Sequence, residues 1–263
     1  MEAILPFITA GDPDLSGLPD LLARFAALGV RTLELGLPHS DPVADGPVLQ
    51  AAAQRAMAAG ASPRRVLQSL AQAGPSPDLV LFTYFNPLLQ LGRDLLPLLR
   101  PTPVKALLVV DLPPGEEPGW ESELRGAGYP IIPLLSPSTP LARAQALLAA
   151  RPDPGPDHPF AQRFAYVVAR MGVTGDGQEL EWDPLRERLQ ALRAVSGRPL
   201  AVGFGLDRPE LLEQVRRLGA TPVIGSALVQ ALHGGRSLEA FLEPRLGAPR
   251  QLATPETRPS GCS

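Results

Sequence analysis

The sequence predicts a single (β/α)8 barrel of the TIM type, an α/β fold in which strands and helices alternate along the chain. The chain has 263 residues, 44% of them hydrophobic, which suits one barrel of about 250 residues with an ample core. Its short apolar runs are continuous rather than alternating, and such strands are typical of a parallel sheet that is buried on both faces. About eight strand–helix pairs fit the chain, which favours a barrel over an open, doubly wound sheet.

Each predicted strand is a short apolar run followed by residues that favour turns, such as glycine, proline, asparagine and aspartate. Glu34 is the one charged residue inside these runs, and it lies in the middle of the second strand. No G-x-G-x-x-G motif opens a helix, which argues against a dinucleotide-binding fold. The predicted strands are residues 4–9, 32–37, 79–84, 106–110, 130–135, 164–169, 199–202 and 221–224.

The predicted helices lie between these strands, and several carry recognisable start signals. Thr139 is the expected N-cap of one helix, with Pro140 at its first helical position. Asp207 and Glu210 form the pattern of a capping box before another. Helical spacing covers residues 18–28, 48–57, 63–70, 141–148, 185–195 and 211–218, and two further helices reach residues 99 and 232. Residues 151–159 are expected to form a proline-rich loop.

Composition and charge exclude several classes of protein. The net charge of -3 leaves no basic face for nucleic acid, and no apolar run approaches the roughly 20 residues of a membrane span. The single cysteine, Cys262, excludes a disulfide framework and fits a reducing compartment. The first residues lack the features of a signal peptide. We therefore expect a soluble, cytoplasmic protein with one domain, residues 1–246, and a flexible tail, residues 247–263.

Glycines follow three successive predicted strands at the end where barrel enzymes bind their ligands. Glycine lets backbone N–H groups approach an anion closely, and the N-terminus of a helix adds a favourable dipole. These glycines either form a phosphate site or simply permit tight turns, and their clustering on one sector favours phosphate. They are Gly172 and Gly175 after the sixth strand, Gly203 and Gly205 after the seventh, and Gly225, next to Ser226, after the eighth.

Two carboxylates, Glu34 and Asp45, are the candidate acid and base. Carboxylates in different environments can have separated pKa values, as acid–base catalysis requires. Each also has a structural alternative, because a strand glutamate can be salt-bridged and a loop aspartate can serve a turn. Phe7 and Tyr84 are expected to form an apolar wall. Asn86 and Asp111 complete the polar set, although Asp111 is as well explained by hydrogen bonds to loop N–H groups. The residues thus indicate a phosphate-binding barrel enzyme with acid–base chemistry.

The segment ELGLPHSDPVADGP, residues 34–47, closely resembles the signature of the tryptophan synthase alpha subunit family. LPFITAGDP, LFTYFNPLLQLG, VVDLPP, RMGVTG, VGFG and GSALV are similar to other motifs of that family, in the same order, from about residue 4 to 243. The resemblance implies a lyase of tryptophan biosynthesis that cleaves indole-3-glycerol phosphate to indole and glyceraldehyde 3-phosphate in a retro-aldol reaction. It also implies an αββα heterotetramer with a beta subunit that holds pyridoxal phosphate, whereas the alpha subunit needs no cofactor or metal.

The same resemblance assigns roles to individual residues. Glu34 matches the general acid/base and Asp45 the partner of the indole N–H. Phe7 and Tyr84 match positions near the indole ring, and Thr174 matches a residue of the loop after the sixth strand. The positions that match the phosphate site are Gly175, Gly205, Gly225 and Ser226.

Four departures from the family pattern keep alternatives open. The helix that usually precedes the first strand is missing here, and the stretch before Gly225 is one residue shorter. His39 replaces an aromatic residue, and residues 151–159 resemble an insertion. One alternative is another phosphate-binding barrel, such as an isomerase of amino-acid biosynthesis. The other is a weakly catalytic paralogue that binds and regulates a beta subunit.

Overall fold

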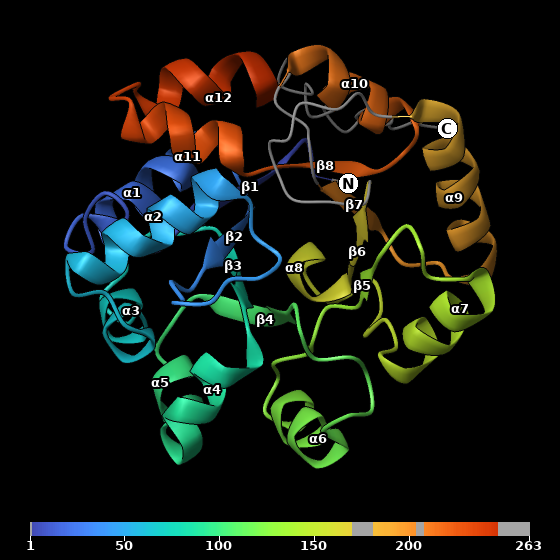
Figure 1. Ribbon diagram of the computed structural model, residues 1–263, viewed down its shortest axis with the longest axis horizontal. Helices are drawn as coiled ribbons and strands as arrows, with labels where there is room; N and C mark the ends of the chain where they lie inside the picture. The colour runs from blue at the N-terminus through green and yellow to red at the C-terminus, as the bar shows by residue number, and fades with distance from the viewer. Residues whose placement is uncertain (1, 170–180, 204–207, 247–263) are drawn as a thin grey trace, which may run out of the picture.

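The computed structural model is a nearly closed barrel of eight parallel strands surrounded by helices (Figure 1). The structure describes residues 2–169, 181–203 and 208–246. The sheet order is β4-β3-β2-β1-β8-β7-β6-β5, and every pair of neighbouring strands is parallel. The predicted fold is confirmed. The strands are β1 Leu5–Thr9, β2 Thr32–Gly36, β3 Asp78–Thr83, β4 Val104–Val109, β5 Leu134–Leu135, β6 Ala165–Val168, β7 Leu200–Gly203 and β8 Thr221–Ile224.

The barrel is closed between β4 and β5 by very few hydrogen bonds. Leu107 pairs with Ile131 in an isolated parallel bridge. The N–H of Leu107 donates to the carbonyl of Pro130 at 3.0 Å, and the N–H of Ile132 donates to the carbonyl of Leu107 at 2.7 Å. The predicted strand over residues 130–135 is wrong in its extent, because Pro130 and Pro133 have no N–H to donate to a ladder. This seam is the weakest junction of the barrel.

The helices form a ring outside the strands (Figure 1). Most predicted helices are confirmed. Gly92, with φ of 52°, divides the helix expected to reach residue 99 into α4, η1 and α5. The ring comprises α1 Leu18–Ala27, α2 Pro47–Ala58, α3 Pro63–Leu70, α4 Phe85–Leu91, η1 Gly92–Asp94, α5 Leu95–Leu99, α6 Pro118–Gly126, α7 Leu141–Ala150, α9 Trp182–Val195, α10 Pro209–Arg217, α11 Ser226–His233 and α12 Leu238–Leu246.

The structure tests one of the two expectations about helix starts. The predicted cap at Thr139 is wrong, because Pro140 is the N-cap of α7 and the Thr139 hydroxyl instead lies 2.9 Å from that of Ser136. Asp207, the first residue of the predicted capping box, lies outside the described residues. Helix α12 was not predicted. Among the described residues, no helix is long and apolar enough to cross a membrane.

The core has two parts, one inside the barrel and one between the strands and the helices. In parallel strands, residues in register point to the same face of the sheet. Phe7 pairs with Glu34, Glu34 with Val80, and Val80 with Ala106. Phe7, Val80 and Ala106 belong to the cluster inside the barrel, so Glu34 points into the barrel with them.

A short helix, α8 Phe160–Arg163, closes the N-terminal end of the barrel. This helix was not predicted from the sequence, which indicated only a proline-rich loop over residues 151–159. It lies within the ring of strands and contacts β2, β3 and β4 (Figure 1). Ala161 and Phe164 are fully buried inside the barrel. The side-chain amide of Gln162 donates to the carbonyls of Lys105 and Gly128, both at 2.9 Å. Helix α8 thus ties together the two sides of the β4–β5 seam.

Residues 2–4 lead directly into β1, and none of them is helical. Helix α8 and the segment before it lie at this end of the barrel. The segment is anchored by Arg151, whose guanidinium forms two 3.0 Å contacts with the buried carboxylate of Glu121 on α6. Arg151 also donates to the carbonyl of Leu112 at 3.1 Å.

Candidate active site

Glu34 is a buried carboxyl group in the middle of β2. Its side chain has no exposed surface, and neither of its oxygens has a hydrogen-bond partner among the described residues. Burial raises its pKa well above the usual value, because the charged form loses its hydration. An unpaired, buried carboxyl is costly for stability. It is also the state that a general acid needs, since the proton is retained and no neighbour engages it.

Asp45 lies in the loop after β2 and is held by Tyr84, the residue that follows β3. The Tyr84 hydroxyl donates to Oδ1 of Asp45 at 3.2 Å and accepts the N–H of Ala44 at 3.0 Å. Burial raises the pKa of Asp45 to about 6, and the bond from Tyr84 opposes this rise. Gln50 donates to the carbonyl of Asp45 at 2.8 Å and fixes the loop further. The sequence predicted Tyr84 as an apolar wall, and the structure adds the role of its hydroxyl.

The apolar wall is built by Phe7, as predicted, and by Phe82, which was not predicted. Their rings pack edge to face, with centroids 5.3 Å apart. Gly36 makes room for this arrangement, because a Cβ there would lie 2.5 Å from Cζ of Phe7. A Cβ at Gly225 would lie 3.6 Å from the same side chain. Phe7 therefore lies between the carboxyl of its register partner Glu34 and the end of β8.

Tyr166 on β6 is a second residue that the sequence analysis missed. It is 4% exposed, and burial, then the charges of Glu34 and Asp45, raise its pKa well above the usual value. Its hydroxyl occupies the space beside Gly203, where a Cβ would lie 1.8 Å from the hydroxyl oxygen. One glycine interpreted as part of the phosphate site is thus needed to make room for a tyrosine. A tyrosine in an otherwise aliphatic strand was the only available signal.

Ser226 begins helix α11, directly after Gly225, its N-cap. The Ser226 hydroxyl is buried and has no hydrogen-bond partner among the described residues. A helix N-terminus with a hydroxyl of this kind suits an anion. Thr174, Gly175 and Gly205, the other residues predicted to contact the substrate, lie outside the described residues. The structure therefore describes one of the three glycine turns in full.

Three further polar residues are sorted by their contacts. Oδ1 of Asp111 accepts the N–H of Phe85 at 2.7 Å, so the structural explanation holds for this aspartate. Asn86 is exposed on α4 and is not part of the site. The ring of His39 lies 5.3 Å from the ring of Tyr84, tilted by 36°. His39 therefore packs on the tyrosine that holds Asp45.

Together these features define a (β/α)8 barrel with one buried carboxyl group inside it, a second in the loop after β2, an aromatic wall and a helix N-terminus suited to an anion. A family model described as "Tryptophan synthase alpha chain" matches residues 1–246. The chain belongs to the tryptophan synthase alpha chain family, and it is a lyase of tryptophan biosynthesis.

Individual relatives agree with this assignment. The chain is 36% identical over 245 residues to the tryptophan synthase alpha chain of Arabidopsis thaliana, covering 92% of this chain and 85% of the relative. It is 41% identical over 252 residues to that of Gloeobacter violaceus, covering 93% and 84%. Among solved structures, tryptophan synthase from Mycobacterium tuberculosis matches with a TM-score of 0.79 and 27% identity, covering 93% of this chain and 91% of that one. A structure of the tryptophan synthase α2β2 complex from Pyrococcus furiosus matches at 0.75 and 29% identity, covering 92% and 94%.

Proposed function

We propose that this chain cleaves indole-3-glycerol phosphate to indole and glyceraldehyde 3-phosphate, with Glu34 as the general acid/base. The observation that carries the proposal is the Glu34 carboxyl itself, which is fully buried, unpaired and in register with Phe7. A structural carboxylate at this position would have a cation or donor beside it. An unengaged carboxyl inside a barrel is kept at a cost in stability, which function explains.

The reaction needs three changes at defined atoms. A proton is added to C3 of the indole ring, and the bond from C3 to the hydroxyl-bearing carbon breaks. The hydroxyl on that carbon loses its proton and becomes the aldehyde of glyceraldehyde 3-phosphate. The electron pair of the broken bond restores the aromatic indole. A carboxyl with a raised pKa can give the first proton and take the second, so Glu34 suffices for both transfers.

Asp45 is proposed to accept the indole N–H and to stabilise the positive charge that develops on the ring when C3 is protonated. Its pKa of about 6 leaves most of it ionised at neutral pH. The indole would pack on Phe7 and Phe82, with its N–H directed to the Asp45–Tyr84 pair. The phosphate would lie at Gly225 and Ser226, together with Gly175 and Gly205, and Thr174 is proposed to contact the substrate from the loop after β6. Fixing both ends of the substrate supplies the orientation on which much of the rate depends.

The partner of this chain is a tryptophan synthase beta subunit, in an αββα heterotetramer. The similar Pyrococcus furiosus structure concerns mutual activation within the α2β2 complex. The alpha subunit of this family needs no cofactor, and pyridoxal phosphate belongs to the beta subunit. We infer that the enzyme works in the cytoplasm, because its single cysteine fits a reducing compartment.

The experiment that tests this function is indole release from indole-3-glycerol phosphate by the purified chain, with and without the beta subunit from the same source. Slow release alone and a large increase with the partner are expected. Release of no indole under either condition would contradict the proposal. Binding of the beta subunit without lyase activity would instead identify a regulatory paralogue.

A further inference from the structure

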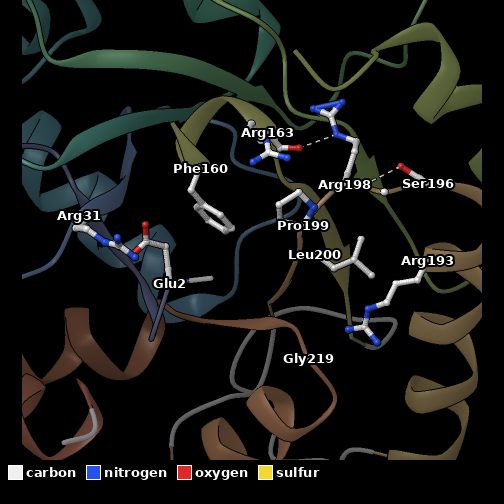
Figure 2. Close-up of a pocket in the computed structure, with 11 residues that line it drawn as sticks. Glu2, Arg31, Phe160, Arg163, Arg193, Ser196, Arg198, Pro199, Leu200 and Gly219 are labelled. Atoms are coloured by element: carbon white, nitrogen blue, oxygen red, sulfur yellow. Dashed lines mark hydrogen bonds and ion pairs between the residues drawn. The ribbon is translucent and has the colours of Figure 1, made fainter. Parts of the chain in front are cut away.

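A cavity of about 540 Å³ (Figure 2) lies at the N-terminal end of the barrel. Asp45 and Ser226 follow β2 and β8 and lie at the opposite end. Its lining residues come from segments that precede strands, from the start of β7, from α8 and from the end of α9. Glu2 precedes β1, Arg31 precedes β2, and Gly219 precedes β8. Pro199 precedes β7, which begins at Leu200. Its volume is within the range of small-molecule sites.

Positive charge dominates this cavity. Arg31, Arg163, Arg193 and Arg198 line it, and Glu2 is the only carboxylate of the lining. The chain as a whole carries a net charge of -3, so the local excess is opposite to the overall charge.

Two of these arginines are paired with carboxylates. Glu2 contacts Arg31 at 3.1 Å, and Asp153 contacts Arg163 at 3.1 Å. The Arg193 guanidinium donates to the carbonyl of Leu218, and the Arg198 guanidinium donates to the carbonyls of Arg163 and Arg151. Among these described side chains, four guanidinium groups face two carboxylates, which leaves an excess of two positive charges.

Arg163 and Arg198 are held in place by their partners, whereas the side chains of Arg31 and Arg193 are exposed to solvent. Arg163 binds Asp153 through two nitrogens, at 3.1 and 3.2 Å. Gly219, with φ of 74°, allows the close approach of Arg193, because a Cβ there would lie 3.1 Å from Nη2 of that arginine. Burial lowers the pKa of Arg198 to about 10, since its charge is only partly compensated. Arg198 directs its guanidinium toward the carbonyl of Arg163 (Figure 2).

The remaining wall is apolar. Phe160 of α8 lies on one side, and Pro199 and Leu200 lie on another (Figure 2). A pocket with clustered guanidinium groups and a small apolar wall is complementary to an organic anion, since arginine binds carboxylate and phosphate oxygens in a fixed fork geometry.

We propose that this cavity binds a small polyanion, with phosphate or carboxylate groups directed to Arg163 and Arg193 and a short apolar part packed on Phe160 and Leu200. The ligand is distinct from the substrate, because the two sites open at opposite ends of the barrel. Pyrophosphate serves as the probe for phosphate groups, and citrate serves as the probe for carboxylate groups. The anion that binds with the higher affinity identifies which group the cavity prefers.

The sharpest test changes the charge of the cavity at Gly197. A Cβ at Gly197 meets nothing within 4 Å, and its φ is outside the left-handed region, so a side chain is accommodated without strain. Gly197→Glu adds a carboxylate to the wall, and Gly197→Gln is a control of the same size. Binding is measured by calorimetry on the full chain, with glycerol 3-phosphate present to occupy the active site.

The wild-type chain is expected to bind one pyrophosphate or citrate per chain under these conditions. Gly197→Glu is expected to weaken that binding by more than about fivefold relative to Gly197→Gln, because the added charge lies near the anion. The Arg193→Gln variant should weaken it as well. Indole release should remain unchanged in all variants.

Three results would overturn the proposal. The first is no saturable binding of either anion by the wild-type chain. The second is equal affinity of the Gly197→Glu and Gly197→Gln variants. The third is displacement of the anion by glycerol 3-phosphate, which would place it in the active site. These outcomes do not depend on turnover, so they are separate from failure of the proposed lyase function.

Discussion

Replacement of Tyr84 by phenylalanine removes the hydroxyl that donates to Asp45 and keeps the ring that packs on His39. In the native chain this hydroxyl donates to Asp45 at 3.2 Å. Burial raises the pKa of Asp45 to about 6, and the bond from Tyr84 opposes this rise. A hydrogen bond to a charged group contributes about 1.5–3 kcal/mol. Because Asp45 is not fully buried, water replaces part of this stabilisation when the hydroxyl is removed. The remaining loss corresponds to a change of about one unit in the pKa of Asp45. Loss of the bond disfavours the ionised form, so the pKa of Asp45 rises.

The assay is the pH dependence of kcat/KM for indole release between pH 5 and 9. The acidic limb should move upward by about one pH unit in Tyr84→Phe. At pH 6 the ionised fraction of Asp45 would fall from about one half to about one tenth, a loss of about fivefold, and at pH 9 the two enzymes should differ little. Tyr129→Phe is the matched control, because Tyr129 is also buried but lies next to α6. An unmoved acidic limb, or an equal loss at every pH, would refute the proposed role of the Tyr84–Asp45 pair.

Three further predictions concern the scaffold. Gln162→Ala should lower the free energy of unfolding by about 1–3 kcal/mol while leaving indole release unchanged, since two carbonyls at the β4–β5 seam lose their donor. Denaturant titration checks this, and an unchanged midpoint would show that α8 does not close the barrel. Arg151→Met should cost about 3–5 kcal/mol because it leaves the buried Glu121 carboxylate unpaired, and the double variant with Glu121→Leu should recover much of that loss. Gly203→Ala places a methyl group on the Tyr166 hydroxyl, so indole release should fall at least about tenfold with a smaller effect on thermal stability. Full activity in that variant would show that the position of Tyr166 is unimportant.

The sequence predicted the barrel because its signals are local. Continuous apolar runs and helical spacing depend on neighbours within a few residues, and they located all eight strands. Glu34 was identifiable for the same reason, as the only charge in those runs. Asp45 was identifiable from the turn-forming loop that follows.

Other features could not be predicted, because non-local contacts determine them. Helix α8 is held by carbonyls of Lys105 and Gly128, which are distant in sequence. Phe82 and Tyr166 line the barrel interior, but a run buried on both faces does not reveal which residues point inward. Thr139 was assigned as a cap from a local pattern, whereas its hydroxyl pairs with Ser136 in the turn after β5.

The central claim is that Glu34 is the acid/base of the reaction, and the direct measurement is turnover by the Glu34→Gln variant in complex with the beta subunit. We expect indole release to fall by at least about 10²–10⁴-fold, because glutamine can neither give nor take the proton. Glycerol 3-phosphate binding should be retained. Burial raises the pKa of Glu34 in the folded chain above its pKa in the unfolded chain. The native carboxyl therefore lowers the stability of the fold as pH rises above the pKa of the unfolded chain. The Glu34→Gln variant should accordingly be at least as stable as the native chain at pH 7. Near-normal indole release, or loss of folding together with ligand binding, would contradict the account.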